Sequence, residues 1–161
     1  MKLTLWRSVR RTHAAGAFSG EGAARFPGRY NAPGVRAVYL ADCPAGCGLE
    51  LVASYAAPEA LLTHALFEVV VDVELVDLRK RATQLRYDAT IAAMTASDDY
   101  GVPRRIGAQL AAEQRAGAIV PAATVAEAFN VVIYPDVWRQ FRVKRRVDLA
   151  LDRRVLHRLG S

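Results

Sequence analysis

The sequence has few of the features that define metal-binding or disulfide-linked proteins. Of its 161 residues only Cys43 and Cys47 are cysteines, and a single C-x-x-x-C lacks the second pair of ligands that a structural zinc site needs. The three histidines lie far apart in the sequence, so we expect no metal site. On a helix the two cysteines would share a face, which favours burial as small apolar groups.

Long hydrophobic runs and a targeting segment are also absent. Arg7, Arg10 and Arg11 follow the first methionine with no apolar stretch between, unlike a secretion signal. The most apolar segment, residues 67–76, contains three carboxylates and is too short to span a bilayer. We therefore expect a cytoplasmic protein without membrane contact.

The composition is that of a globular protein, with 52% hydrophobic and 24% charged residues. A chain of this length buries enough surface to fold without a metal or disulfide, and we expect one domain over residues 1–161. The formal net charge is +6, which attracts polyanions, acidic proteins and phosphorylated ligands without choosing among them.

Hydrophobic patterning predicts strands and helices in mixed order. Strands are expected over residues 3–6, 37–40, 67–74, 118–120, 130–134 and 141–149. Helices are expected over 44–55 and 103–115, with helical segments after Pro58, within 79–97 and over 152–156, and residues 14–34 are expected to form a loop. Without a regular βαβ rhythm, this order favours a compact α+β domain with a mixed sheet and flanking helices.

Some finer expectations follow from local signals. Asp42 suits the N-cap of the helix over 44–55, whose Leu49, Val52 and Ala53 would then face the core. Asp98 or Asp99 could cap the later helix, and a glycine at 117 would end it.

The segment from Pro27 to Gly34 is the strongest candidate for a ligand site. Its glycines let the backbone approach a ligand closely, and the guanidinium of Arg29 offers planar paired donors suited to phosphate oxygens. Tyr39 follows near the end of the next strand, where its ring could stack on a flat heterocycle. Glu50 interrupts an apolar helix, and a buried glutamate needs a cation or a hydroxyl as partner.

Arg29, Tyr39 and Glu50 together suit a ligand with an anionic centre, a flat ring and a carbon that becomes cationic when a bond breaks. Oxidised nicotinamide dinucleotide (NAD⁺) has all three features. Taken singly, each residue also has an ordinary explanation: a turn arginine, a packed core tyrosine and a solvent-facing helix residue. Asn31 and Asn130 offer further polar contacts, or simply cap turns. No G-x-S-x-G elbow, Walker loop or Rossmann fingerprint is present.

In this order the motifs resemble the RES-domain toxins, a family paired with Xre-type antitoxins. The resemblance covers most of the chain. Its pieces are Leu5-Trp6-Arg7, the small-residue loop through Ala23, Gly28-Arg29-Tyr30-Asn31 with Gly34, then Tyr39 and Glu50, and finally Val120-Pro121-Ala122-Ala123 with Asn130 and Pro135.

The resemblance implies a fold related to ADP-ribosyltransferases and an enzyme that consumes NAD⁺ as a substrate, without a metal. Members cleave the nicotinamide–ribose bond, or transfer ADP-ribose to a protein acceptor such as a metabolic enzyme. An antitoxin, part of which blocks the active site, is the implied partner. The residues that map onto the family's catalytic positions are Arg29, Tyr39, Glu50 and Ala122. The residues expected to contact NAD⁺ are Arg29, Tyr30, Asn31, Tyr39 and Asn130.

Ala122 departs from the family pattern, which has serine at this position. Alanine has no hydroxyl and makes no side-chain hydrogen bond. Either the neighbouring Thr124 substitutes for the serine, or the chain carries an inactivating serine-to-alanine change. We prefer the second explanation, so the chain is expected to be an attenuated or inactive variant.

Two other classes of function stay open. The pI of about 9.7 and the basic residues from Arg139 to Arg146 suggest a nucleic-acid-binding module, but no docking motif or interleaved aromatic residue accompanies them. Direct nucleic-acid binding is therefore not expected. The alanine at 122 instead suggests a catalytically inactive interaction protein. The acceptor of ADP-ribose, whether protein, water or phosphate, is not specified by the sequence.

Overall fold

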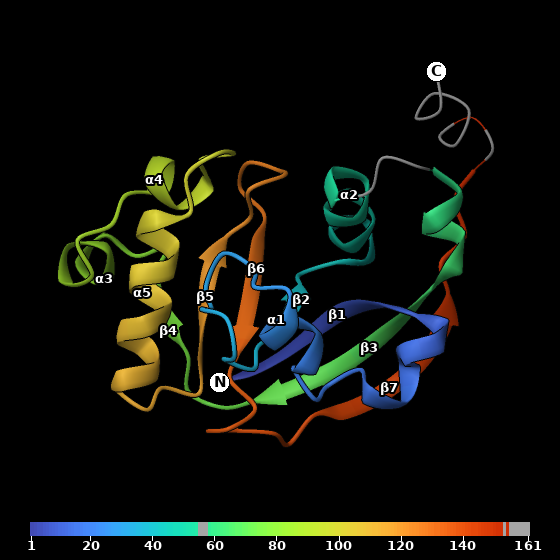
Figure 1. Cartoon of the computed structure of the whole chain (residues 1–161), viewed down its shortest axis with the longest axis horizontal. Helices are drawn as coiled ribbons and strands as arrows, with labels where there is room; N and C mark the ends of the chain where they lie inside the picture. The colour runs from blue at the N-terminus through green and yellow to red at the C-terminus, as the bar shows by residue number, and fades with distance from the viewer. Residues whose placement is uncertain (55–57, 153, 155–161) are drawn as a thin grey trace.

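A seven-stranded mixed sheet runs through the molecule in the computed structural model, which describes residues 1–54, 58–152 and 154 (Figure 1). The strand order is β4-β5-β6-β2-β1-β3-β7. Only β4 and β5 pair in parallel, and the other pairings are antiparallel. The strands are β1 (Lys2–Arg10), β2 (Val38–Ala41), β3 (His64–Asp72), β4 (Val76–Asp77), β5 (Gly117–Pro121), β6 (Phe129–Ile133) and β7 (Arg142–Asp148). The α-helices are α1 (Glu21–Arg25), α2 (Pro44–Ser54), α3 (Arg81–Arg86), α4 (Ile91–Thr95) and α5 (Gly101–Ala112), and the 3₁₀ helices are η1 (Arg11–Gly16) and η2 (Pro58–Thr63).

The helices α2, α3, α4 and α5 form two groups on one face of the sheet (Figure 1). At one end α3, α4 and α5 cover β5 and β6, where Ile106 is buried with Val120 and Val132. At the other end α2 packs on β1 and β2, and Cys47 is buried near Leu66 of β3. The sheet between the two groups is not covered by a long helix, which leaves room for a pocket (Figure 1).

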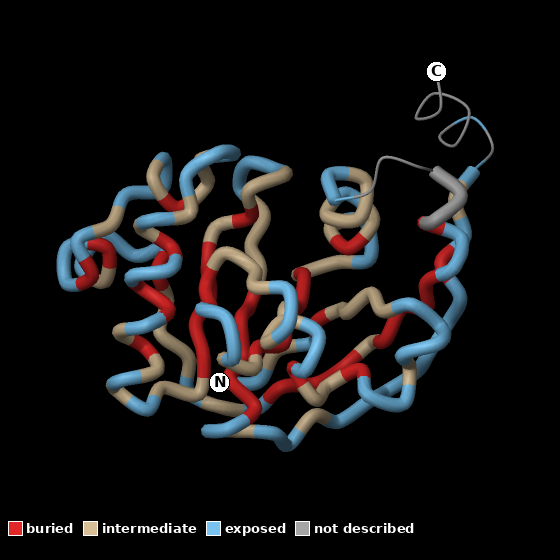
Figure 2. Tube along the Cα trace, viewed as in Figure 1, coloured by how far each residue is buried: buried red, intermediate tan, exposed pale blue. Residues whose placement is uncertain are grey.

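The opposite face of the sheet is covered by irregular chain. Phe18 stacks on Phe141 with ring centroids 4.9 Å apart, and both pack on a core that contains Leu5 and Val131. The central strands are therefore buried on both faces (Figure 2). This explains why β5 and residues 131–133 of β6 are continuous apolar runs in the sequence rather than alternating ones.

The predicted α+β class with a mixed sheet is confirmed. The main strands form where the patterning places them, with shifted ends, and helical turns form after Pro58 and within 79–97. The two-residue strand β4 was not predicted, because two residues give no pattern to detect. The loop prediction for 14–34 is wrong in part, since α1 lies inside it. The helical turn expected over 152–156 falls mostly outside the described residues.

The predicted core-facing side of α2 is wrong for Leu49 and Ala53 and correct for Val52. Leu49 is 43% exposed and Ala53 is also exposed, whereas Cys47 is buried and Leu51 and Val52 pack beside it. Apolar residues surround most of this helix, so its sequence does not reveal which side faces the sheet.

Two predicted helix ends are also corrected. Cys43, not Asp42, precedes the first residue of α2, and its Sγ accepts a hydrogen bond from the N–H of Gly46 (3.3 Å). The glycine at 117 does not end α5, which finishes at Ala112. It begins β5 instead, where a Cβ would collide with the backbone of β6, so only glycine fits.

Candidate active site

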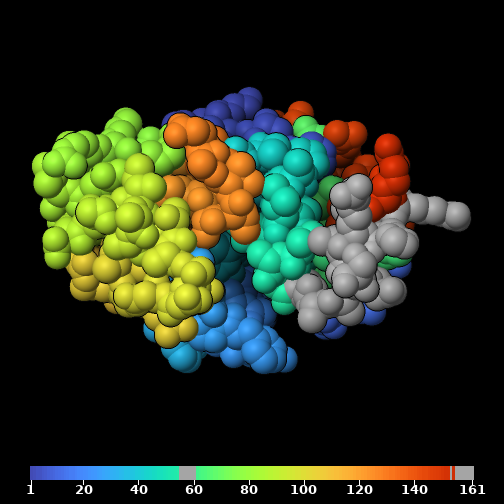
Figure 3. Space-filling model, turned by 90° about the horizontal axis from the view of Figure 1, so that it is seen from above, coloured from blue at the N-terminus to red at the C-terminus, as the bar shows by residue number. Residues whose placement is uncertain are grey.

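A cavity of about 480 Å³ opens between the two helical groups. Figure 3 looks down on this hollow, with α2 on one side and the chain around residues 100 and 125 on the other. Its walls come from β1, β2, α2, β5, β6, the turn at 27–30 and Tyr100, the residue before α5. The volume lies within the range of small-molecule sites.

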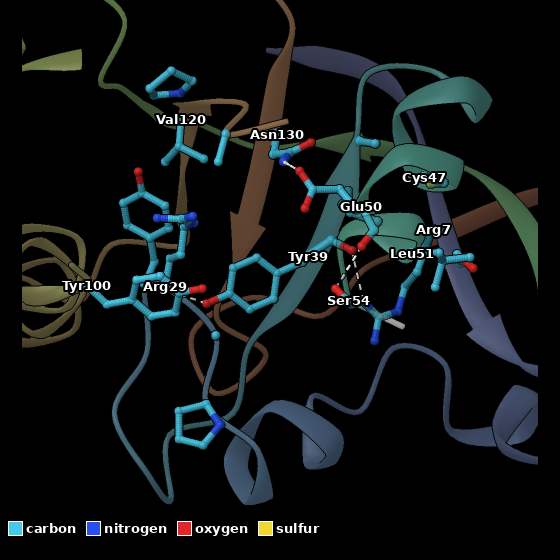
Figure 4. A pocket seen from close by; sticks show the side chains of 18 residues that line it. Arg7, Arg29, Tyr39, Cys47, Glu50, Leu51, Ser54, Tyr100, Val120 and Asn130 are labelled. Carbon is cyan, nitrogen blue, oxygen red and sulfur yellow. Dashed lines mark hydrogen bonds between the residues drawn. The ribbon is translucent and has the colours of Figure 1, made fainter. Parts of the chain in front are cut away.

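The three residues of the predicted trio all line this cavity. Arg29, Tyr39 and Glu50 come from the turn after α1, from β2 and from α2 respectively. Figure 4 shows their side chains around one space. The tertiary structure therefore brings together the guanidinium, the phenol ring and the carboxylate that the sequence analysis selected.

Arg29 is held by the segment that leads into α5. Its Nη1 donates to the carbonyl of Ala96 at 2.5 Å, and its guanidinium lies over the ring of Tyr100, 4.4 Å from the ring centroid. Arg29 has no ion pair among the described residues. Its charge is therefore available to an anionic ligand.

The hydroxyl of Tyr39 is used inside the protein. It donates to Oδ1 of Asn31 (2.8 Å) and accepts from the N–H of Tyr30 (2.9 Å). Burial raises the pKa of Tyr39 above its usual range, so the phenol stays neutral. Gly28 lies directly against the ring, because a Cβ there would be 2.7 Å from Cζ. The ring, rather than the hydroxyl, is what Tyr39 presents to the pocket.

Asn31 does not line the pocket. It is buried, and its side chain bonds only to the protein. Oδ1 accepts from the N–H of Gly28 (2.9 Å) as well as from Tyr39, while Nδ2 donates to the carbonyls of Ala23 (2.8 Å), Ala32 (3.2 Å) and Val35 (2.9 Å). These bonds make Asn31 the residue that holds the turn together, and its contact with NAD⁺ stays a prediction.

Tyr30 lines the pocket but is only 2% exposed. Its carbonyl accepts from the hydroxyl of Tyr134 (2.8 Å). Its own hydroxyl is buried without a hydrogen-bond partner among the described residues, and burial raises its pKa. Tyr30 therefore contributes an uncharged wall close to Arg29.

The carboxylate of Glu50 is tied to the chain around β6. Its Oε1 accepts from Nδ2 of Asn130 (2.9 Å) and from Oγ1 of Thr124 (3.1 Å). Asn130 also lines the pocket, but the interaction it makes there is with Glu50 (Figure 4). Glu50 thus faces the pocket and accepts hydrogen bonds from two donors. Of the two possibilities left by the sequence, it is the partnered glutamate and not the solvent-facing one.

Ala122 is placed beside the pocket rather than in it. Pro121 and Ala123 belong to the lining and Ala122 does not. It is buried, and its N–H donates to the carbonyl of Ala128 (3.0 Å), which closes the loop between β5 and β6.

Arg7 is the charged residue that the site prediction missed among the residues given for the pocket lining. β1 and β2 pair only at Trp6 and Ala41. The next residue of β1 is Arg7, whose guanidinium donates to the carbonyls of Tyr39 (2.8 Å) and Ala17 (2.5 Å). Burial lowers its pKa to about 10, so it is charged at neutral pH, and no carboxylate pairs with it among the described residues. The available sequence signal was an arginine directly after the apolar Leu5-Trp6 of the first strand.

No helix within the described ranges is long and apolar enough to cross a membrane. In the same part of the chain, no three side chains of histidine, cysteine, aspartate or glutamate gather as a group that could hold a metal ion.

Comparison with known proteins gives the family and the fold of the chain. The family model described as the RES domain matches residues 4–153, and the chain therefore belongs to the RES-domain family, as its motifs indicated. It is similar to a chain in the crystal structure of the M. tuberculosis MbcT-MbcA toxin-antitoxin complex, with 26% identity and a TM-score of 0.79 over 99% of this chain and 90% of that one. This likeness confirms the expected fold class. No curated protein matches the sequence significantly.

Proposed function

We propose that this protein is the toxin of a toxin–antitoxin pair and an enzyme that cleaves the nicotinamide–ribose bond of NAD⁺. The ADP-ribose then passes to a protein acceptor, to water or to phosphate. One observation carries the proposal: Arg29, Tyr39 and Glu50, which belong to three separate elements, line one cavity together with Arg7. Membership of the RES-domain family supports the same conclusion.

The charges of the pocket suit each part of NAD⁺. Arg7 and Arg29 are two guanidinium groups without carboxylate partners among the described residues, and they would bind the diphosphate. The ring of Tyr39 would pack against the nicotinamide side. Burial of Tyr30 and Tyr39 keeps both phenols neutral, so neither opposes the anionic ligand.

The carboxylate in the pocket would stabilise the transition state of nicotinamide departure. Departure of nicotinamide neutralises its ring and leaves an oxocarbenium-like ribose carbon, as in glycoside hydrolysis. A fixed negative charge near that carbon stabilises the transition state more than the ground state. We assign this role to Glu50, because it is the pocket's carboxylate among the described residues. Water, phosphate or a protein side chain would then attack the ribose carbon.

We favour an active enzyme over an inactive variant, because Thr124 supplies the hydroxyl that Ala122 lacks. Its Oγ1 donates to Oε1 of Glu50 (3.1 Å), as expected if Thr124 substitutes for the family serine. Comparing the chain with its Ala122→Ser variant tests this point: similar rates of nicotinamide release support natural divergence, and a large gain in the serine variant supports an inactivating change.

The decisive experiment measures free nicotinamide after incubation with NAD⁺. The chain and Ala122→Ser are assayed first, and Glu50→Gln is made in the more active of the two. We expect Glu50→Gln to lower kcat by at least about a hundredfold while the melting temperature stays unchanged. Glu68→Gln is the matched control, because Glu68 of β3 pairs with Arg145 of β7 and lies outside the pocket. If neither the chain nor Ala122→Ser releases nicotinamide, the proposed enzymatic activity is refuted.

The antitoxin and the acceptor need separate tests. The similarity to a chain from a toxin–antitoxin complex supports a protein partner that neutralises this one. Expression of the chain is expected to arrest bacterial growth, and Glu50→Gln is expected to relieve the arrest. Labelled NAD⁺ added with cell extract distinguishes transfer from hydrolysis, since transfer labels a protein band and hydrolysis labels none.

A further inference from the structure

The carboxylate of Glu50 is held by only one of its two oxygens. Oε1 accepts from Oγ1 of Thr124 (3.1 Å) and Nδ2 of Asn130 (2.9 Å). Oε2 has no hydrogen-bond partner among the described residues. The terminal torsion of glutamate is broad and roughly two-fold, so a carboxylate with one donor keeps considerable freedom, whereas two donors on the same oxygen fix its plane.

Thr124 reaches Glu50 from outside the cavity. It is half-buried on the loop between β5 and β6, and it is not part of the pocket lining. The loop is closed by the bond from the N–H of Ala122 to the carbonyl of Ala128. The N–H of Asp42, just before α2, also donates to the carbonyl of Phe129 (3.2 Å), so the helix that carries Glu50 and the strand after the loop are tied together.

We propose that Thr124 is a positioning residue for cleavage of NAD⁺, and this inference rests on the proposed function. Its hydroxyl shares Oε1 with the amide of Asn130 and thereby presents Oε2 to the ribose. Because Thr124 is outside the lining, it acts through Glu50 and not on the substrate. Asn130 has the same effect from the pocket side, and its direct contact with NAD⁺ stays a prediction.

This arrangement predicts a specific kinetic signature. Loss of the Thr124 hydroxyl frees the carboxylate to rotate, which weakens the stabilisation of the ribosyl cation but leaves the diphosphate and nicotinamide contacts in place. Thr124→Val removes the hydroxyl at nearly constant volume and is expected to lower kcat about ten- to hundredfold, the effect of one hydrogen bond to a charged group. KM should change by less than about threefold, since the interaction matters mainly in the transition state.

Three comparisons separate positioning from a structural effect. Thr124→Ser keeps a hydroxyl and should retain kcat within about threefold of the parent. Thr95→Val is the matched control, because the Thr95 hydroxyl bonds only to the carbonyl of Ile91 in α4 (2.9 Å). In the Glu50→Gln background, Thr124→Val should have no further effect on kcat, since its role passes through the carboxylate. Melting temperatures are measured throughout, and Thr124→Ala gives a second measurement if the valine variant does not fold.

The outcomes distinguish this inference from the proposed function. No nicotinamide release by the chain or by Ala122→Ser overturns both. Release by the parent with unchanged kcat in Thr124→Val and Thr124→Ala overturns the role of Thr124 alone. An equal loss in Thr124→Ser and Thr124→Val also overturns it, because the serine hydroxyl should restore the bond.

Discussion

Gly28→Ala is expected to lower both the stability of the protein and its activity. A Cβ at Gly28 would lie 2.7 Å from Cζ and the hydroxyl oxygen of Tyr39, and 2.9 Å from Cε2. To reach an ordinary contact of 3.4 Å, the ring would have to move by about 0.7 Å. Such overpacking costs about 1–3 kcal/mol, and at about 2–4 °C per kcal/mol for a domain of this size the melting temperature should fall by about 2–12 °C.

The same displacement should disturb the site. The Tyr39 hydroxyl is bonded to Asn31 and to the backbone of Tyr30, beside Arg29, so movement of the ring shifts the turn that carries the guanidinium. We expect kcat/KM for nicotinamide release to fall about tenfold or more, because sub-ångström errors in placement reduce catalysis strongly. The assays are urea unfolding, thermal melting and nicotinamide release.

Gly48→Ala is the matched control for this prediction. Gly48 lies inside α2, and a Cβ there meets no atom within 4 Å, so alanine should stabilise the helix by about 0.5–1 kcal/mol. Wild-type stability and wild-type turnover of Gly28→Ala would show that the ring of Tyr39 is free to move, and would refute the packing argument.

Three further predictions concern the surroundings of the pocket. Asn31→Ala should lower the free energy of unfolding by about 2–4 kcal/mol, because it leaves several buried polar groups of the turn unpaired; a loss below about 0.5 kcal/mol in urea titration would contradict this. Arg7→Gln should raise KM for NAD⁺ about tenfold or more, and an unchanged KM would remove Arg7 from the binding site. Iodoacetamide at pH 8 should modify the half-buried Cys43 and spare Cys47, since burial raises the pKa of the Cys47 thiol to about 12 and leaves about one molecule in ten thousand as thiolate. Mass spectrometry that finds Cys47 labelled first in folded protein would contradict the last prediction.

Helix α2 shows that a sequence can predict a helix without predicting which side of it is buried. The apolar run and Pro44 are sufficient to predict a helix there, since these are local signals. The side of the helix that faces the sheet is a different matter, because Leu49 and Leu51 are equally apolar and only packing separates them. Leu49 is exposed and Leu51 packs near Cys47, and this choice places Glu50 toward the pocket.

The glycine-rich turn shows the same division. The sequence identified Arg29 and Asn31 as polar residues in one tight segment, but their roles differ in the structure. Arg29 lines the cavity, while Asn31 is enclosed by its own turn and bonds to five protein groups. Whether a polar side chain faces the cavity or the protein interior depends on the chain packed around it. A single sequence does not show that packing.

The sequence by itself determined the α+β class, most of the strands, the RES-domain family and the three residues at the centre of the proposed site, because apolar patterning and short motifs are local properties. The tertiary structure alone decided which groups share the pocket. Pairing of β2 with β6 brings Asn130 and Thr124 to Glu50 across 80 and 74 residues of chain. Because β1 and β2 pair only at Trp6 and Ala41, the side chain of Arg7 can reach the pocket. Contacts at such separations follow from strand order and register, which are set by the packing of the whole sheet.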